Sequence, residues 1–286
     1  MTAPTVGFIG LGAMGLPMAQ RIASAGHPVL AVEASPARCD QARAAGITVG
    51  DVATLREADL VIVMVATADQ LHQVLAGPDG ALSVMAVGTT CVVMSTVGPA
   101  AVEKIGAQAA ECGVDVLDVP VTGGVSGAEA GTLSLLVGGD PEVVTRVEDV
   151  LRCLGSILLC GSRVGDGQAV KVINQLLCSV HLAAAAEALM LAERLGLDSA
   201  KVLEAVNSGA GSSWMLGDRG PRMLEDTPEP LTMLDIFVKD STLVAEAAAD
   251  AGFGVPILEA ARERFRRAAD SGYGRCDDSE VRRAYL

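Results

Sequence analysis

Basic residues are scarce in this chain. Its 286 residues include 21 lysines and arginines but 35 aspartates and glutamates, which gives a formal net charge of −14. An excess of negative charge disfavours general attraction to nucleic acid or to an anionic membrane surface. We therefore expect neither partner, and an anionic substrate would need a local basic pocket.

Long apolar runs are also missing. The longest clear ones, around residues 60–66 and 176–186, fall short of the roughly 20 residues that a membrane-spanning helix needs. Residues 1–19 contain four glycines and no basic segment, which is atypical of a signal peptide. These features predict a soluble protein, with the cytoplasm as its location.

Metal-ligand patterns are absent as well. The seven cysteines and three histidines form no C-x-x-C pair and no group at metal-ligand spacing. Small buried thiols in a reducing compartment explain the cysteines better than disulfides or a metal site do. We expect no metal.

Strand-like and helix-like segments alternate in the first half of the chain, and half of all residues are apolar, enough for a sizeable core. The strand-like runs lie at 6–9, 28–32, 60–65, 91–95, 114–119, 133–137 and 157–159. Such alternation is typical of βαβ units. It predicts an α/β fold, a doubly wound and largely parallel sheet with helices on both faces.

Strand signals end near Gly165. Residues 167–195 contain no strong helix breaker and are apolar on nearly every side, which predicts one long buried helix, packed against a helical domain or a partner subunit. Further helical patterns cover 199–207, 231–251 and 255–271, whereas 209–214 and 226–230 are loop-like. We expect an α/β domain over residues 1–164 and an all-helical domain over residues 165–286, joined by the long helix.

A glycine pattern follows the first predicted strand. It has the form G-x-G-x-x-G and comprises Gly10, Leu11, Gly12, Ala13, Met14 and Gly15. Its glycines permit a tight turn, close approach of the backbone to a pyrophosphate, and close packing of a helix on a strand. Because it opens a helix, whose N-terminus attracts phosphate, the pattern predicts a dinucleotide site.

An acidic residue indicates which dinucleotide binds. Glu33 ends the second predicted strand, 18 residues after Gly15, where a carboxylate can accept hydrogen bonds from ribose hydroxyls. The same carboxylate would repel a 2′-phosphate, so NAD is favoured over NADP. Glu33 could instead be a solvated acid, and Arg38 could serve a phosphate, so NADP stays open.

One group of polar residues indicates the type of reaction. Lys171, Asn174 and Gln175 have the spacing i, i+3, i+4, which places an amine and two carboxamides on one helix face. The amine can pass a proton and the carboxamides can hold a hydroxyl or a carboxylate, as oxidation of a small hydroxy acid requires. A solvated surface lysine is the alternative.

Five spaced motifs together resemble the β-hydroxyacid dehydrogenase family, which includes 3-hydroxyisobutyrate dehydrogenase and tartronate semialdehyde reductase. They are residues 10–18, 95–96, 120–124 with 131–132, 165–174 and 237–240, and they cover nearly the whole chain in order. The resemblance implies a Rossmann domain followed by an all-helical domain for substrate and oligomerisation, with the active site in the cleft between them.

The resemblance also implies roles for single residues. Lys171 would be the general acid/base, and Lys239 would close over the substrate and the nicotinamide. The residues implied to bind substrate are Thr122, Gly123, Gly124, Asn174 and Gln175, and those implied to contact cofactor beyond the glycine pattern and Glu33 are Val65, Thr96 and Lys239. The chain departs from the family at Gln175, often Asn, at Thr122, often Ser, and at residues 64–69, which lack a common proline.

The segment 211–215, with Asp218 and Arg219, looks similar to the L-threonate dehydrogenase branch, which oxidises a four-carbon sugar acid. Ser212 and Ser213 could bond hydroxyls that a methyl-bearing substrate lacks, or the segment could be a plain loop with Trp214 in the core. We favour NAD-dependent oxidation of a small hydroxy acid such as L-threonate. The alternatives are 3-hydroxyisobutyrate dehydrogenase or tartronate semialdehyde reductase activity and, more remotely, a dinucleotide-binding scaffold without turnover; a homodimer or homotetramer is expected.

Overall fold

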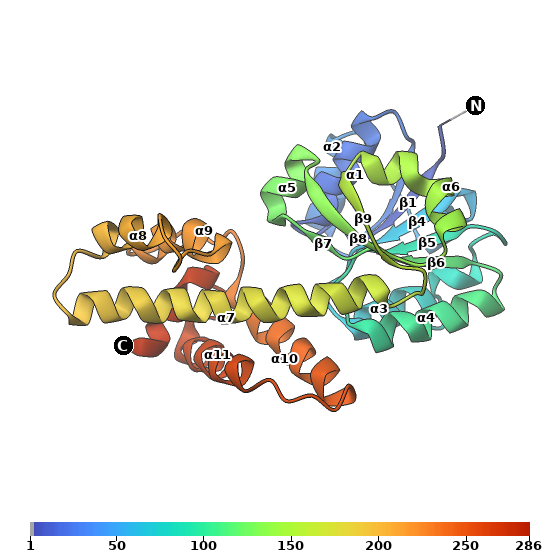
Figure 1. The fold of residues 1–286 in the computed structure, drawn as a ribbon. Coiled ribbons are helices and arrows are strands. Elements are labelled where there is room, and N and C mark those ends of the chain that lie inside the picture. The colour runs from blue at the N-terminus through green and yellow to red at the C-terminus, as the bar shows by residue number, and fades with distance from the viewer. Residues whose placement is uncertain (1–2) are drawn as a thin grey trace. The chain divides into compact units, whose positions relative to one another are not determined.

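The computed structural model describes residues 3–286. The chain divides into two compact units, Met1–Lys171 and Val172–Leu286 (Figure 1). The first unit is α/β and the second is helical, and each has hydrophobic cores of its own.

The first unit contains one sheet of nine strands within the described residues, in the order β3-β2-β1-β4-β5-β6-β8-β7, with β9 paired to β8. The strands are β1 (Val6–Ile9), β2 (Val29–Val32), β3 (Thr48–Val49), β4 (Leu60–Val63), β5 (Thr90–Val93), β6 (Asp115–Asp118), β7 (Val121–Thr122), β8 (Leu133–Gly138) and β9 (Gly155–Gly161). Strands β1 to β6 pair in parallel, and β8 runs antiparallel to β6 and β7. The largely parallel sheet is confirmed; β3 and β7, two residues each, were not predicted.

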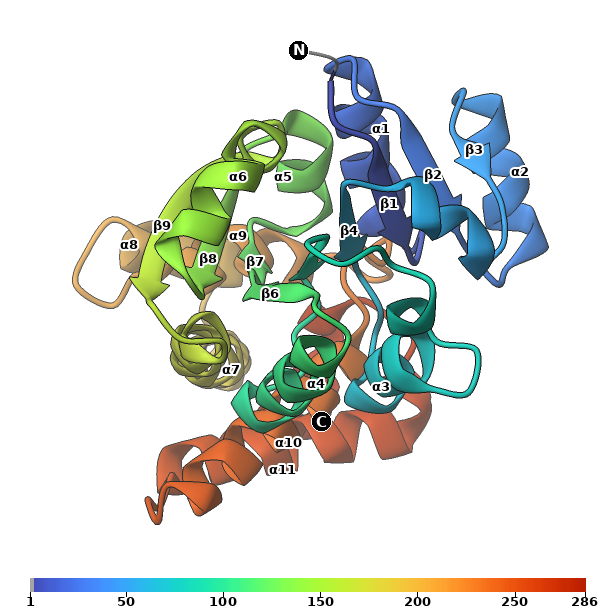
Figure 2. The ribbon, with the colours of Figure 1, turned by 90° about the vertical axis from the view of Figure 1, so that its right-hand side faces the viewer.

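Helices cover both faces of this sheet. They are α1 (Gly15–Ser24), α2 (Pro36–Ala44), α3 (Ala68–Ala76), α4 (Pro99–Glu111), α5 (Gly124–Ala130) and α6 (Pro141–Arg152). Figure 2 shows α3 and α4 on one side of the strands and α5 and α6 on the other. In β4, Leu60 and Ile62 pack with α1, α5 and α6, whereas Val61 and Val63 pack with α3 and α4. Burial on both faces explains why parallel strands appear in the sequence as continuous apolar runs.

Helix α7 (Asp166–Arg194) begins in the first unit and continues into the second, which confirms the predicted long helix. In the second unit its side chains enter two cores. Leu182 and Leu189 pack with residues of three other helices, and Val172 packs with Val244 and Leu258. Besides α7, the helices of this unit are α8 (Ser199–Asn207), α9 (Trp214–Met223), α10 (Leu234–Asp250) and α11 (Pro256–Ala268), followed by a π turn (Ala269–Tyr273) and a 3-10 segment (Asp278–Tyr285).

Helix α9 was not predicted, because its sequence contains Gly217, Gly220 and Pro221, which have poor helix propensity. Two contacts explain why it forms. The Ser213 hydroxyl caps its first turn by accepting a hydrogen bond from the backbone N of Leu216 at 3.0 Å. A Cβ at Gly220 would lie 2.6 Å from a methyl of Leu203, so the glycine permits close packing of α9 on α8.

Helix α7 is the one helix in residues 3–286 that is long and apolar enough to cross a membrane, with a mean hydropathy of 1.5 over its most apolar window. The run at residues 176–186, which is too short by itself, is thus part of a longer apolar helix. Half of that window is buried inside the protein, and one such helix is weak evidence for a membrane span, because core helices of soluble proteins can be equally long and apolar.

Candidate active site

The residues predicted to bind cofactor follow the carboxyl ends of neighbouring parallel strands. The glycine turn follows β1, Glu33 follows β2, Val65 follows β4 and Thr96 follows β5. Parallel strands end at the same edge of a sheet, so all four segments meet at one edge. Strand β1 lies between β2 and β4. Strands β2 and β3 follow on one side of β1, and β4, β5 and β6 follow on the other, so the strand order reverses at β1. Open α/β sheets bind ligands at such a reversal.

The glycine turn leaves its backbone open to a ligand. Gly10 has φ +92°, and a Cβ there would collide with the carbonyl oxygen of Met64. Gly15 opens α1, and a Cβ there would collide with the carbonyl oxygen of Gly10, so α1 packs tightly on the turn. At Gly12 the nearest atom to an added Cβ is Nη1 of Arg38, at 3.6 Å. A tight turn with free space at its middle glycine fits a dinucleotide pyrophosphate.

The Glu33 carboxylate ties this turn to the end of β2. Its Oε2 accepts a hydrogen bond from the backbone N of Leu11 at 2.6 Å, and its Oε1 accepts one from the backbone N of Ser35 at 2.7 Å. Each carboxylate oxygen has a second lone pair for a ribose hydroxyl. The bond to Leu11 was not foreseen, because it joins residues 22 positions apart.

The start of α7 is held at the carboxyl ends of β5 and β6. The buried Asp118 carboxylate accepts hydrogen bonds from the backbone N of Gly165 at 2.9 Å and of Gln168 at 2.7 Å. Burial raises the pKa of Asp118 to about 6, although these two backbone bonds oppose the rise. The Gln168 side chain bonds the turn after β5. Lys171, one turn further along α7, is only 7% exposed, so the alternative of a solvated surface lysine is wrong.

Thr122, Gly123 and Gly124 form the turn that joins β7 to α5. Gly123 has φ +129° and Gly124 has φ +65°, a backbone path that favours glycine. This geometry suits both a plain turn and a set of backbone amides open to a carboxylate.

A hydrogen-bonded chain of side chains links α7 and α10 in the second unit. Asn174 Nδ2 donates to Gln175 Oε1 at 2.7 Å, and Gln175 Nε2 donates to Asp240 Oδ2 at 2.5 Å. The ammonium of Lys239 lies 2.9 Å from Asp240 Oδ1. Asp240 is only 4% exposed, so Lys239 and Asp240 are not a simple surface pair.

Sequence reasoning gave no role to Asp118 or Asp240, although both left a signal. Asp118 is a carboxylate within the apolar run 114–121, and Asp240 lies between Phe237 and Val244 on the buried face of α10. A charged residue at a core position requires partners.

The segment 212–214 differs from its sequence interpretation. Ser212 Oγ lies 2.7 Å from Asn207 Oδ1, and the Ser213 hydroxyl caps α9, so both hydroxyls take part in local structure. Trp214 is 67% exposed, with the Arg219 guanidinium carbon 5.4 Å from its ring centroid. The alternative that placed Trp214 in the core is wrong.

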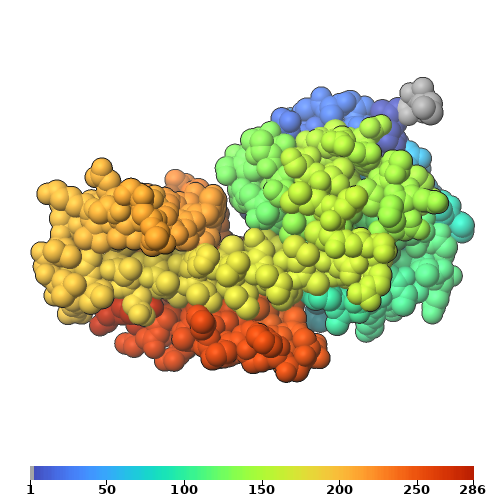
Figure 3. Space-filling view, viewed as in Figure 1, coloured from blue at the N-terminus to red at the C-terminus, as the bar shows by residue number. Residues whose placement is uncertain are grey.

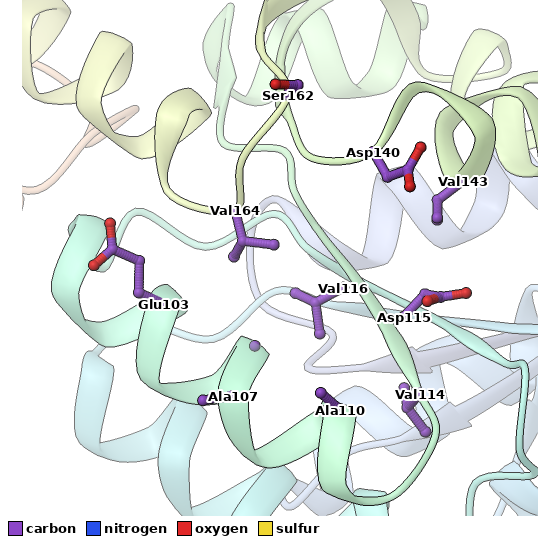
Figure 4. A pocket seen from close by; sticks show the side chains of 11 residues that line it. Glu103, Ala107, Ala110, Val114, Asp115, Val116, Asp140, Val143, Ser162 and Val164 are labelled. Carbon is purple, nitrogen blue, oxygen red and sulfur yellow. The ribbon is translucent and has the colours of Figure 1, made fainter.

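A cavity of about 390 Å³ in the first unit lies elsewhere, among α4, β6 and the start of α6 (Figure 4). Three carboxylates line it, those of Glu103, Asp115 and Asp140, without a basic side chain. This lining suits no phosphate, and none of the predicted site residues lies on it. Among residues 3–286 no group of three or more His, Cys, Asp or Glu side chains could hold a metal ion.

Comparisons with known proteins cover nearly the whole chain. Residues 5–165 match the family model of the NAD-binding domain of 6-phosphogluconate dehydrogenase, and residues 165–285 match that of the NAD-binding region of NADP-dependent 3-hydroxyisobutyrate dehydrogenase. The L-threonate dehydrogenase of Cupriavidus necator is 38% identical over 279 residues, 96% of this chain and 94% of that protein. The 2-hydroxy-3-oxopropionate reductase of Escherichia coli is 35% identical over 96% of this chain and 95% of its own length.

Solved structures show the same relationship. A 3-hydroxyisobutyrate dehydrogenase from Salmonella typhimurium superimposes with a TM-score of 0.89 at 33% identity, over 98% of this chain and 99% of that one. Similarity of this degree along the entire length, with both family models matched in order, shows that the chain belongs to the β-hydroxyacid dehydrogenase family and is an NAD(P)-dependent oxidoreductase.

Proposed function

We propose that this protein interconverts a small hydroxy acid such as L-threonate and its oxo acid or semialdehyde, with NAD as the hydride carrier and Lys171 as the general acid/base. The burial of Lys171 carries the proposal. This side chain lies one helical turn beyond the bonds that join α7 to the turn bearing Thr96, a proposed cofactor contact. The 38% identity to an L-threonate dehydrogenase supports the choice of substrate.

The proposed reaction separates a proton from a hydride. NAD, when bound, accepts the hydride from the carbinol carbon. The Lys171 amine takes the hydroxyl proton, and in the reverse direction its ammonium donates a proton to the developing alkoxide and stabilises the negative charge. The backbone amides of Thr122, Gly123 and Gly124 hold the substrate carboxylate, because glycine permits close approach.

The remaining roles follow the two parts of the chain. Residues 1–164 bind the cofactor, through the glycine turn at 10–15, Glu33, Val65 and Thr96. Residues 165–286 bind substrate and support oligomerisation: Asn174 and Gln175 hold a hydroxyl or carboxylate, and Lys239 closes over the substrate and the nicotinamide. Asp240 supports these roles, since it binds both Gln175 and Lys239.

The absorbance of NADH tests the proposed function. The protein is mixed with NAD and a panel of C3 to C5 hydroxy acids, and the reverse reaction is started from NADH and 2-hydroxy-3-oxopropionate, the semialdehyde of tartronate. We expect the highest kcat/KM with L-threonate. A higher kcat/KM with 3-hydroxyisobutyrate or with the semialdehyde would change the assigned substrate. Binding of NAD without turnover of any compound would support a dinucleotide-binding scaffold.

The charge of Glu33 predicts the choice of cofactor. The carboxylate repels a 2′-phosphate, so we expect a higher kcat/KM with NAD than with NADP. Glu33→Gln removes the charge and keeps the shape, and it should lower the ratio of kcat/KM with NAD to kcat/KM with NADP by about tenfold. Arg38→Ala is the matched variant, and it should weaken only NADP. Equal or better efficiency of the unaltered protein with NADP would contradict the role of Glu33.

We propose a homodimer or homotetramer in the cytoplasm. Leu177, Ala184 and Leu191 recur every seven residues on α7 with exposed side chains, and Ile173 nearby is 60% exposed. Seven-residue spacing of apolar groups is typical of helices that pair. Figure 3 shows α7, in yellow, reaching the surface. Sedimentation measures the assembly, and a mass of 29.1 kDa, that of one chain, would contradict it.

A further inference from the structure

We infer that Gln168 is a positioning residue: its side chain fixes the turn that carries Thr96 to the first turn of α7, three residues before Lys171. The inference rests on the proposed function, because it aligns the proposed acid/base with a proposed cofactor contact.

The side chain of Gln168 is fully buried and makes three hydrogen bonds to one turn. Its Nε2 donates to the carbonyl oxygen of Ser95 at 2.9 Å. Its Oε1 accepts hydrogen bonds from the backbone N of Val97 at 3.1 Å and of Gly98 at 3.0 Å. These bonds lie on both sides of Thr96, so a single side chain holds the backbone before and after that residue.

The same turn is linked to the segment that carries Val65. The Ser95 hydroxyl accepts a hydrogen bond from the backbone N of Val65 at 2.7 Å. Gln168 therefore acts on two segments that the family resemblance assigns to the cofactor, directly on the turn after β5 and through Ser95 on the turn after β4.

The other end of the link is a fixed helix backbone. Asp118 binds the backbone N atoms of Gly165 and Gln168. A Cβ at Gly167 would collide with the carbonyl oxygen of Leu136, so this helical turn lies directly against β8. Residues i and i+3 share a helix face, so Gln168 and Lys171 project from the same side of α7. A shift of the Thr96 turn relative to α7 would be a shift relative to Lys171.

The pattern of bonds requires a carboxamide. One end must accept from two N–H groups while the other donates to a carbonyl, and at neutral pH neither a carboxylate nor a thioether does both. A carboxyl group does both when it is protonated. Gln168→Glu therefore restores the bond to Ser95 only while its carboxyl is protonated, whereas Gln168→Met cannot restore it at any pH.

The experiment compares these two variants with Leu151→Ala, a cavity-forming change in a fully buried residue of α6 that lowers the stability of the same unit. All assays run well below the lowest melting temperature. For Gln168→Met we expect faster amide hydrogen exchange at Val97 and Gly98, about tenfold weaker NADH binding, and a kcat roughly 10- to 100-fold lower. Leu151→Ala should keep NADH affinity and kcat near normal.

The pH profile separates positioning from folding. For Gln168→Glu, kcat relative to the unaltered protein should rise as pH falls, because protonation of the introduced carboxyl restores the donor. The nearby ionisable groups are Asp118 and Asp166, at the same helical turn, Glu103, next to Gly165, and Lys171. All are present in the reference protein, so a change in the ratio reports the introduced carboxyl together with its coupling to these groups.

Unchanged NADH affinity and kcat in Gln168→Met, or losses no larger than in Leu151→Ala, would overturn the inference, as would a flat ratio for Gln168→Glu. Absence of turnover in the unaltered protein would instead overturn the proposed function. In that case NADH affinity and amide exchange of Gln168→Met test the positioning role, and no change in either would contradict it.

Discussion

Replacing Lys171 with alanine lowers kcat by roughly 10² to 10⁴, the usual contribution of a general acid/base. NAD affinity stays close to normal, because the change removes a proton carrier and leaves the glycine turn and Glu33 intact. Steady-state kinetics with the best hydroxy acid of the panel measure the loss, and fluorescence titration with NADH measures the affinity. A fall in kcat and kcat/KM by the same factor is expected for a group that acts in the transition state.

Two further variants show whether the effect belongs to this amine. Lys171→Arg keeps a positive charge that does not release its proton, so it should fail as a base for oxidation of the hydroxy acid. Lys201→Ala removes an exposed lysine of α8, with a side chain 82% exposed, and should leave kcat unchanged. Near-normal turnover of Lys171→Ala would remove the central assignment.

The largest expected loss of stability follows from Asp278→Ala in the second unit. The Asp278 carboxylate is fully buried and binds two guanidinium groups of α9, those of Arg219 at 3.0 Å and Arg222 at 3.2 Å. Both arginine side chains are nearly buried, 12% and 11% exposed. Removal of this buried carboxylate leaves the guanidinium N–H groups that face it without an acceptor, although Asp218 and Asp277 still pair with the two arginines, and we expect a cost of about 3–5 kcal/mol.

The only tryptophan of the chain reports this loss directly. Trp214 begins α9 and stacks with Arg219, so its fluorescence during urea unfolding follows the second unit. Lys201→Ala is the matched control, since Lys201 pairs with Asp198 at 3.5 Å on the surface of the same unit, with side chains 82% and 53% exposed. An exposed pair contributes at most about 1 kcal/mol. Equal free energies of unfolding for the two variants would contradict the structural role of Asp278.

The same network of charged residues explains the fold of the C-terminal segment, which local sequence patterns do not predict. Asp277 accepts hydrogen bonds from the backbone N of Leu231 at 3.0 Å and from Ser279, and Asp278 joins the C-terminal segment to α9. The segment 276–286, Cys-Asp-Asp-Ser-Glu-Val-Arg-Arg-Ala-Tyr-Leu, has many charged residues and no strong helical pattern. Asp277 and Asp278 can be buried because arginines from α9, more than 50 residues earlier, neutralise them.

The sequence by itself determined the features that depend on near neighbours and on periodicity. Leu60–Val63 is apolar at every position because a parallel strand is buried on both faces. Part of the apolar surface of α7 packs with other helices, whereas Ile173, Leu177 and Leu191 are exposed. The glycine turn could be located for a similar reason, since its strand, turn and helix are consecutive. The order of five motifs was enough to identify the family.

The tertiary structure alone decided which distant side chains act together. Gln168 bonds Ser95 across 73 positions, Gln175 bonds Asp240 across 65, and Asp118 bonds Gln168 across 50. No local pattern encodes such pairs, because each depends on where the sheet and the helices bring two segments into contact. A buried polar group needs a partner, and the fold decides which residue that is. The partner of Gln168 on α7 and that of Lys239 on α10 could therefore be identified only from the tertiary structure.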